Sequence, residues 1–248
     1  MKIVLIGSGA MGQLVAKLAG QHDHEITSTL TSRDATRSVD DLVSEVRGND
    51  AAIDFSIAGA VPKNVEVCAL AGVPLVEGTT GWHAQLDEIK RIVDDSQTAL
   101  IYGANFSVGV QVFYRIAARA AELFRDLDSY DAFIEEAHHK RKRDAPSGTA
   151  LQLGEIVAAH LDREVPVAST RAGYIPGTHR VGFDSSADQI TLEHVARGRE
   201  GFAAGALLGA RFRRALMCRE AAQSPALLPP SEHLNSWCRC PTRVRRCG

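Results

Sequence analysis

Cysteine is scarce in most of this chain, and its absence excludes one class of protein. Of five cysteines in 248 residues, only Cys68 lies within the first 217. Small secreted folds that depend on disulfide bonds distribute paired cysteines along the whole sequence. We therefore do not expect a disulfide framework.

Long apolar runs are missing as well. No stretch reaches the roughly 18 consecutive apolar residues that a membrane-spanning helix needs. The first residues, MKIVLIGSG, lack both the apolar segment and the cleavage site of a signal peptide. The sequence therefore predicts a soluble, cytoplasmic protein with no membrane partner.

An excess of charge of one sign is absent too. The 28 Lys and Arg residues nearly balance the 30 Asp and Glu residues, for a formal net charge of -2. No overall positive field attracts nucleic acid, so we expect no such partner. Hydrophobic residues make up 45% of the chain, which is enough for one large domain or two small ones.

The first part of the chain alternates strand-like apolar runs with segments of helical spacing. Buried strands joined by crossover helices form a parallel sheet that is covered on both faces. Residues 1–106 are thus predicted to be a Rossmann-type α/β domain with a doubly wound parallel sheet. The expected strands are 2–6, 25–30, 51–55, 73–76 and 98–102, and the helical segments are 11–19, 38–47, 60–71 and 83–94.

The pattern changes after residue 106. Alternating strand-like runs there are typical of an open antiparallel or mixed sheet. Residues 107–199 are therefore predicted to be a second, α+β domain. A helix over 200–212 is expected to complete the first domain. The second domain is expected to contain helices 108–124 and 150–160 and strands 130–137, 179–184 and 188–196.

A glycine-rich turn follows the first predicted strand. Gly7, Gly9 and Gly12 match G-x-G-x-x-G at the start of a helix, which is the context that the dinucleotide-binding motif requires. The glycines permit a tight turn, close approach of a pyrophosphate, and packing of helix on strand. The alternative is ordinary loop chemistry. The predicted cofactor-binding residues here are Gly7, Ser8, Gly9, Ala10, Met11 and Gly12.

The end of the second strand bears on which dinucleotide binds. An acidic residue there favours the 2′-hydroxyl of NAD, but this chain has Ser32 and Arg33. A hydroxyl and a guanidinium suit the 2′-phosphate of NADP. Asp34 follows at once, so Arg33 could instead be an ordinary solvated loop charge. We predict that NADPH is preferred and that NADH is possible.

A basic segment with two histidines carries the second set of candidates. His138 titrates near neutral pH, and Lys142 lies four residues further on. Ser147 is placed to cap the following helix, so the N–H groups of Gly148 and Thr149 form an anion cradle. A small dicarboxylate fits this arrangement. The alternatives are a solvated charge run, a nucleic-acid patch, or structural histidines.

These motifs resemble a known family, that of 4-hydroxy-tetrahydrodipicolinate reductase, also called dihydrodipicolinate reductase. The resemblance covers residues 1 to about 212. Its most specific element is E-A-H-H-x-x-K-x-D-A-P-S-G-T-A, which stands here at 136–150. It is supported by DFS at 54–56, GTTGW at 78–82, ANFSVG at 104–109 and REGFAAGAL at 199–207.

The resemblance implies an NAD(P)H-dependent reduction of a cyclic dicarboxylate to tetrahydrodipicolinate in diaminopimelate and lysine biosynthesis. It implies that His138 and Lys142 are catalytic, through proton transfer, and it suggests a homotetramer built on the sheet of the second domain. The implied substrate-binding residues are His139, Ser147, Gly148 and Thr149, with help from Lys140. Further implied cofactor contacts are Gly78, Thr79, Thr80, Gly103, Ala104, Asn105 and Phe106.

Two other functions remain open from the residues. One is another two-domain NAD(P)-dependent dehydrogenase acting on an amino or keto acid. The other is a catalytically inactive, dinucleotide-binding regulator, which would not need His138 together with Lys142.

The C-terminal segment 213–248 departs from the pattern. It holds seven Arg, two Glu and four of the five cysteines. Its apolar residues follow neither a helical nor a strand periodicity, so we expect it to be poorly ordered. We interpret it as the product of a shifted reading frame or as an evolved basic extension. Because His233, Cys238 and Cys240 fit no zinc spacing, we predict no metal site.

Overall fold

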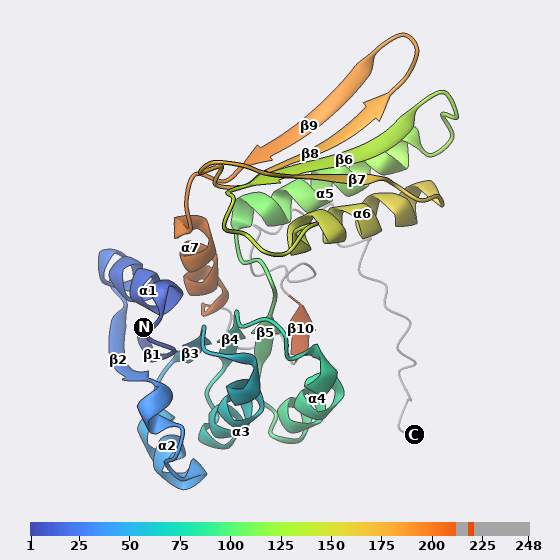
Figure 1. Cartoon of the computed structure of the whole chain (residues 1–248). Coiled ribbons are helices and arrows are strands. Elements are labelled where there is room, and N and C mark those ends of the chain that lie inside the picture. Colours follow the sequence, from blue (N-terminus) through green and yellow to red (C-terminus); the bar gives the residue numbers. More distant parts are fainter. Residues whose placement is uncertain (212–217, 221–248) are drawn as a thin grey trace, which may run out of the picture.

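The computed structural model describes residues 1–211 and 218–220 of the chain. They form two domains, with a six-stranded parallel sheet below and a smaller mixed sheet above in Figure 1. Within the described residues, no helix combines the length and apolar character needed to cross a bilayer.

The lower sheet is parallel, and its strand order predicts where a ligand crevice lies, at the carboxyl ends of the strands. Its order is β10-β5-β4-β3-β1-β2, so the chain moves outward from β1 in one direction and then in the other. Ligands bind open α/β sheets beyond the carboxyl ends of the strands, where this order reverses. The strands are β1 Lys2–Ile6, β2 Glu25–Leu30, β3 Ala51–Asp54, β4 Leu75–Glu77, β5 Leu100–Tyr102 and β10 Cys218–Glu220.

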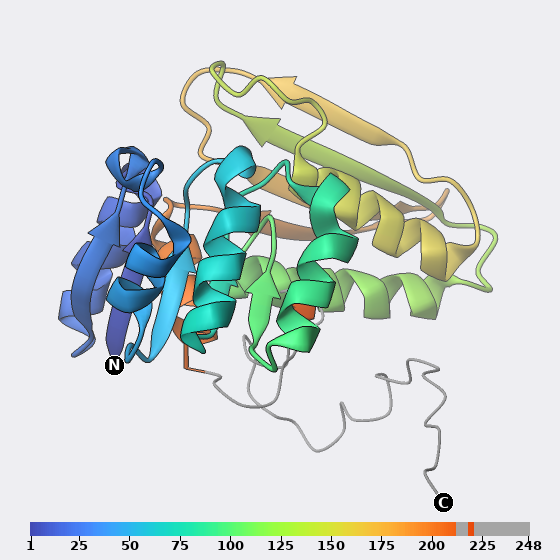
Figure 2. The same cartoon turned by 90° about the horizontal axis from the view of Figure 1, so that it is seen from below.

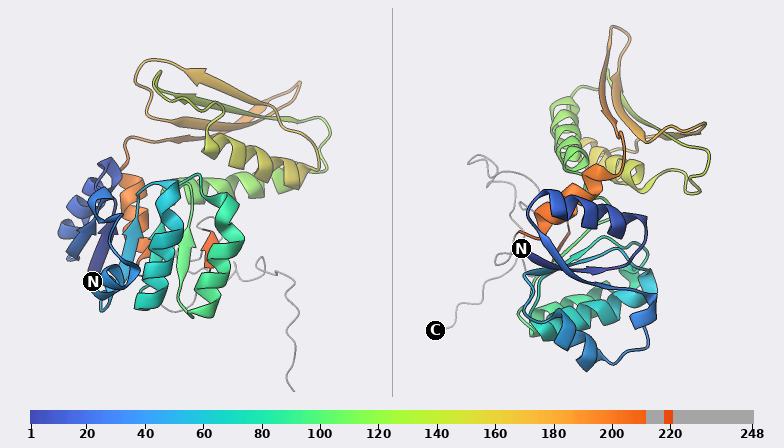
Figure 3. Two further views of the ribbon diagram at one scale, coloured as in Figure 1. Left: turned by 60° about the horizontal axis from the view of Figure 1, so that its bottom comes forward. Right: turned by 90° about the vertical axis from the view of Figure 1, so that its left-hand side faces the viewer.

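Helices cover both faces of this sheet, because successive strand residues point to opposite sides. In β1, Ile3 and Leu5 pack under α1 and α7, while Val4 and Ile6 pack under α2, α3 and α4. The edge-on view in Figure 3 and the view from below in Figure 2 show these layers. The helices are α1 Ala10–Gln21, α2 Val39–Val46, α3 Val61–Ala71, α4 Leu86–Asp95 and α7 Glu200–Gly209, with 3₁₀ turns η1 Ser32–Asp34, η2 Ala58–Ala60 and η3 His83–Gln85.

The upper domain packs two helices on one face of a four-stranded sheet with the order β7-β6-β8-β9. The sheet is mixed, since β7 runs parallel to β6 and the other pairs are antiparallel. Its core includes the buried Ile134, Leu153, Val181 and Phe183. The elements are α5 Val108–Phe124, β6 Asp131–His138, α6 Gly148–Leu161, β7 Val167–Arg171, β8 Thr178–Asp184 and β9 Gln189–Val195.

The chain crosses between the domains twice. It leaves the lower sheet after β5 and returns after β9 to form α7, which packs beside α1 (Figure 1). The first domain is thus completed by residues that follow the second one.

The sequence was wrong on three elements. It missed β7, an edge strand whose residues are mostly exposed and therefore lack an alternating pattern. The last helix ends at Gly209 rather than at residue 212. Residues 218–220 form a strand beside β5, although no strand was expected in the C-terminal segment. The other residues of that segment, and residue 212, lie outside the described part of the chain.

Candidate active site

The glycine turn between β1 and α1 has the geometry that the motif requires. Gly7 has a φ of +102°, and an added Cβ would lie 2.4 Å from the carbonyl oxygen of Phe55. A Cβ on Gly12 would lie 2.0 Å from the carbonyl oxygen of Gly7. Gly9 faces open space, with no atom within 4 Å of such a Cβ. Gly7 and Gly12 therefore serve the turn, and Gly9 leaves room for a ligand.

The N-terminus of α1 is available to an anion. Gly9 is the N-cap residue, no side chain caps the helix, and no acidic residue lies in its first turn. Ser8, Gly9 and Ala10 are exposed. The free N–H groups and the helix dipole favour a phosphate at this point. The residues present thus fit the pyrophosphate of a dinucleotide.

The loop after β2 holds the Asp34 side chain through hydrogen bonds from other residues of the same loop. Its carboxylate accepts hydrogen bonds from the Thr31 N–H at 2.8 Å and from the Arg37 guanidinium at 3.0 Å. These bonds hold the pKa of Asp34 below its usual value. Arg33 is exposed and makes no ion pair with any residue that the structure describes, and Ser32 beside it is exposed too. Asp34 therefore does not neutralise Arg33.

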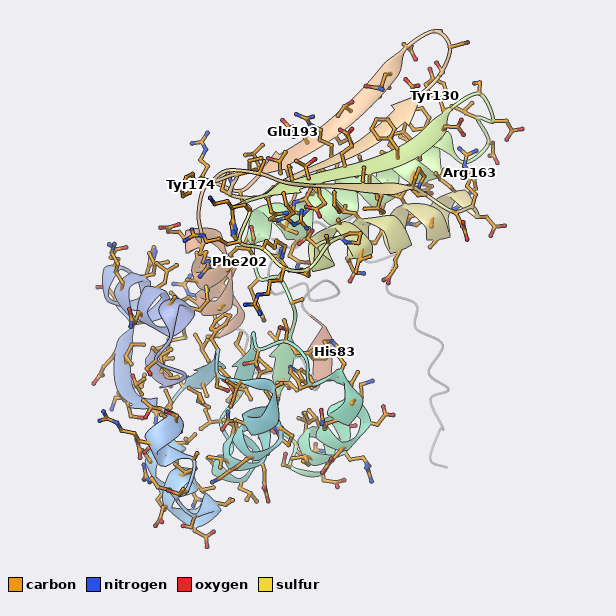
Figure 4. All side chains as sticks on the ribbon, viewed as in Figure 1. His83, Tyr130, Arg163, Tyr174, Glu193 and Phe202 are labelled. Carbon is orange, nitrogen blue, oxygen red and sulfur yellow. The ribbon has the colours of Figure 1, made fainter. Side chains whose placement is uncertain are left out.

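A pocket of about 200 Å³ lies at the junction of the domains, and we call it the junction pocket. Figure 4 places Phe202 at the upper end of α7, where the second domain begins. Phe55, Arg199 and Phe202 were not predicted as site residues. Their position in the sequence could have identified them, because residues that follow β3 or begin α7 lie where an open α/β sheet binds its ligand. The pocket is lined by Met11, Phe55, Gly78, Gly103, Ala104, Phe106, Arg199 and Phe202.

Two buried acids support the floor of this pocket. The Asp54 carboxylate accepts hydrogen bonds from the Ser56 N–H and the Asn64 amide, both at 2.7 Å. The Glu77 carboxyl accepts one from the Thr79 N–H at 2.6 Å. They fix the loops that follow β3 and β4, including the predicted residues Gly78, Thr79 and the exposed Thr80.

The two acids share one proton. Glu77 Oε2 is buried and has no hydrogen-bond donor among the described residues. Burial, followed by the negative charge of Asp54, raises the pKa of Glu77 to about 10. Glu77 is therefore protonated at neutral pH and donates to Asp54.

The predicted anion cradle begins helix α6. The buried Ser147 is its N-cap residue, and its hydroxyl accepts a hydrogen bond from the Ala150 N–H at 3.2 Å. The same hydroxyl lies 3.0 Å from Nε2 of the buried His179. Gly148 and Thr149 stand first and second in the helix, so their N–H groups have no intrahelical acceptor. The Ser147 side chain thus helps to hold the first turn of α6, and with it the N–H groups of the cradle, in place.

A hydrogen bond connects this cradle to the cofactor side. The Asn105 side-chain amide donates to Thr149 Oγ1 at 3.1 Å. Asn105 itself follows β5 and is held by Ser107 and Gln111. Through this bond, a residue predicted to bind cofactor meets one predicted to bind substrate.

His138 lies at the end of β6 in a network of charged groups. Its Nδ1 is 2.5 Å from Glu136 Oε2, and Arg171 binds both oxygens of Glu136 at 2.8 and 2.6 Å. Burial alone would raise the pKa of Glu136. Hydrogen bonds from Arg171, Ser169, His138 and the Ser147 N–H outweigh it and lower that pKa to about 2.

The partly buried His138 and the buried His179 are both neutral at pH 7, because their pKa values are lowered. Burial lowers the pKa of His138, and Glu136 offsets this only in part. Burial and the neighbouring His138 lower the pKa of His179 to about 4. The rings of His138 and His179 meet edge to face at 5.1 Å.

Lys142 and His139 complete the loop. Lys142 Nζ forms an ion pair with Asp144 at 2.8 Å, and its side chain is 25% exposed. His139 is partly buried, and its Nδ1 has no partner among the described residues. Glu136 links His138 to the Ser147 N–H at the start of α6, and Lys142 lies close enough to His138 to influence its pKa. Ser32 and Arg33 lie apart on the first domain.

Comparison with known proteins identifies a family for both domains. The sequence profile described as "Dihydrodipicolinate reductase, N-terminus" matches residues 1–106, and "Dihydrodipicolinate reductase, C-terminus" matches residues 109–224. The second match extends past residue 212, where the sequence resemblance was expected to end.

Individual relatives agree with these profiles. A protein of Christiangramia forsetii named 4-hydroxy-tetrahydrodipicolinate reductase is 36% identical over 86% of this chain and 92% of its own. One of the same name from Xanthomonas campestris is 38% identical over 85% and 91%. The dipicolinate-bound dihydrodipicolinate reductase of Paenisporosarcina sp. TG-14 has the same fold, with a TM-score of 0.73, 22% identity, and 88% and 98% of the two chains covered.

Proposed function

The chain belongs to the dihydrodipicolinate reductase family, and we propose that it catalyses the NAD(P)H-dependent reduction of 4-hydroxy-tetrahydrodipicolinate to tetrahydrodipicolinate. We place this reaction in diaminopimelate and lysine biosynthesis, in the cytoplasm. The membership in a reductase family argues against the alternative of an unrelated amino- or keto-acid dehydrogenase.

The hydrogen bond between Asn105 and Thr149 is the observation that carries the proposal. It brings the cradle at the start of α6 next to the loop that lines the junction pocket. A hydride donor held in that pocket would face a substrate held by the cradle.

The substrate-binding groups suit a dianion. We assign His139, Lys142 and the free N–H groups of Gly148 and Thr149 to the substrate, because they offer positive charge or hydrogen-bond donors. Charge-assisted hydrogen bonds offset the loss of hydration when two carboxylates enter. Lys142 exchanges its ion pair with Asp144 for a substrate carboxylate.

The proton follows the hydride. Elimination of the 4-hydroxyl group as water leaves an unsaturated ring, to which a bound reduced nicotinamide would supply a hydride. The negative charge left on the ring must then be protonated. In the free protein His138 is neutral and holds a lone pair at Nε2. A bound dianion favours the charged ring, so His138 takes up a proton at Nε2 and passes it to the substrate. Lys142, beside it, stabilises the developing charge and supplies or relays a proton.

We further propose that the cofactor is preferentially NADPH. The exposed, unpaired Arg33 and the Ser32 hydroxyl beside it offer a charge-assisted site for the 2′-phosphate. Asp34 would repel that phosphate, but its carboxylate is held by the Thr31 N–H and by Arg37, which also pairs with Glu45. NADH would remain usable, because the glycine turn and the junction pocket would hold the parts that the two dinucleotides share.

One assay tests the reaction. Oxidation of NADPH is followed with freshly made product of dihydrodipicolinate synthase, for the wild type and for His138→Gln and Lys142→Ala. We expect kcat to fall roughly 10²- to 10⁴-fold in both variants, since each removes a proton-transfer group. Cofactor affinity should stay unchanged, because neither residue lies on the first domain.

Arg141→Ala provides the matched control, since Arg141 is exposed in the same loop. It should turn over like the wild type. An inactive wild-type protein that still binds NADPH would instead support the regulator. Near-normal turnover of His138→Gln or Lys142→Ala would remove that residue from the mechanism.

A further inference from the structure

Glu136 is a buried carboxylate to which the proposed reaction assigns no role, and it lies beside His138 on the same strand. The two residues lie on one face of β6, two positions apart, and the Glu136 side chain is fully buried. Its Oε2 lies 2.5 Å from Nδ1 of His138. A buried charge needs close partners, because desolvation is costly.

Arg171 supplies the compensating charge from the neighbouring strand. Parallel pairing of β6 with β7 sets Arg171 opposite His138. The guanidinium binds both oxygens of Glu136 and also donates to the Asp144 carbonyl at 2.6 Å. The Ser147 N–H donates to Glu136 Oε1 at 3.1 Å. Glu136 thus links His138 on one side to the start of the anion cradle on the other.

This arrangement determines which nitrogen of His138 carries the proton. An ionised carboxylate only accepts hydrogen bonds, so Nδ1 must be the protonated nitrogen of the neutral ring. Nε2 then carries the lone pair. It faces Gly177, where an added Cβ would come within 3.1 Å of Nε2. The absence of a side chain at Gly177 keeps that nitrogen accessible.

We propose that Glu136 and Arg171 are positioning residues for proton transfer: Glu136 fixes the tautomer and orientation of His138, and Arg171 keeps Glu136 ionised and in place. The proposal rests on the proposed function, because it assigns His138 Nε2 as the atom that moves the proton. No bond to the substrate is made by either positioning residue.

The charges around His138 explain why both residues are needed. Glu136, Arg171 and Lys142 face His138 directly, and His179 touches its ring. Without Arg171, burial would raise the pKa of Glu136, and a protonated Glu136 could donate to Nδ1 and favour the other tautomer. Hydrogen bonds from Arg171 lower the pKa of Glu136, so that it stays an ionised acceptor for Nδ1–H.

The test replaces Glu136 by an amide, both alone and with its partner. Glu136→Gln leaves Arg171 without a counter-charge and can fail to fold, so the double variant Glu136→Gln/Arg171→Gln serves beside it. An amide can donate as well as accept, and therefore it does not impose one tautomer. Glu155→Gln is the matched control, since Glu155 is an exposed glutamate on α6 of the same domain.

The first measurement needs no substrate. In ¹⁵N-histidine correlation spectra, with His138 assigned through His138→Gln, the wild type and Glu155→Gln should show the Nδ1–H tautomer alone. The double variant should show both tautomers. A single Nδ1–H tautomer in a folded double variant would overturn the proposal.

The second measurement is kinetic. We expect kcat of the double variant to fall at least roughly tenfold while the KM for NADPH stays constant. Glu136 favours the imidazolium, so its loss should move the ionisation of His138 in the pH–rate profile to lower pH. A purely structural role would reduce stability and leave this ionisation in place. If the wild type does not reduce the substrate, the proposed function fails, while the spectra still decide whether Glu136 sets the tautomer.

Discussion

Glu77 holds a proton at neutral pH, and this single proton should appear in the stability of the protein. The folded-state pKa of about 10 lies above the ordinary value of 4.5, so between these values the folded state binds a proton that the unfolded state has released. Stability is therefore lost as pH rises through this window. The slope for one proton is at most about 1.4 kcal/mol per pH unit.

We predict that Glu77→Gln removes this slope. The amide can accept from the Thr79 N–H and donate to Asp54, as the protonated acid does. Urea unfolding at pH 6 and pH 9 should show the variant gaining stability over the wild type as pH rises. The exposed Glu66→Gln should keep the wild-type slope. Equal slopes in the wild type and Glu77→Gln would mean that Glu77 is ionised.

Arg33 carries the second prediction at this scale. Arg33→Ala should raise the KM for NADPH roughly 10- to 100-fold, which corresponds to the loss of hydrogen bonds to a charged group. The KM for NADH should change little. Arg91→Ala, an exposed arginine on α4, controls for the general loss of positive charge. An equal rise for both cofactors would exclude a 2′-phosphate site at Arg33.

Single residues were predictable where their role follows from neighbours in the chain. Gly7, Gly12 and the cap Ser147 act within a turn or a helix start, and the sequence identified them. Arg171 was missed, because it meets Glu136 only through the pairing of two strands. Glu136 stood inside the quoted signature, yet its burial beside His138 was not visible in the sequence.

At the scale of elements, periodicity sufficed wherever an element has one buried side. The strands β1 and β3 and the helices α2 and α5 were located to within two residues. β7 has few buried residues, and β10 is a strand of three residues, so neither shows an alternating hydrophobic pattern in the sequence. Their positions depend on the neighbouring strands, β6 and β5, which hydrogen-bond to them.

At the scale of the whole molecule, the uncovered face of the upper sheet calls for a partner. α5 and α6 cover the other face, while this one has a hollow of about 470 Å³ among exposed side chains. Most oligomers are symmetric assemblies of one chain. We propose a homotetramer formed through this face, which is lined by Phe133, Glu135, Arg180, Gln189, Thr191 and Glu193.

Light scattering coupled to size exclusion checks the assembly. The wild type should have four times the 26.7 kDa mass of one chain. Thr191→Arg places a long charged side chain in the hollow and should reduce the mass, because an unpaired charge is costly at an interface. Leu127→Arg, an exposed position beyond α5, should not. A wild-type monomer would contradict the proposed tetramer.

The return of the chain to its first domain has a consequence for biosynthesis. Ile3, Leu5 and Ile53 lie on the face of the sheet that α7 helps to cover. A ribosome delivers α7 only after the entire second domain, and folding commonly keeps pace with translation. Part of the apolar face of the N-terminal domain therefore stays uncovered until α7 has been synthesised. The domain that is synthesised first completes its folding after the second one.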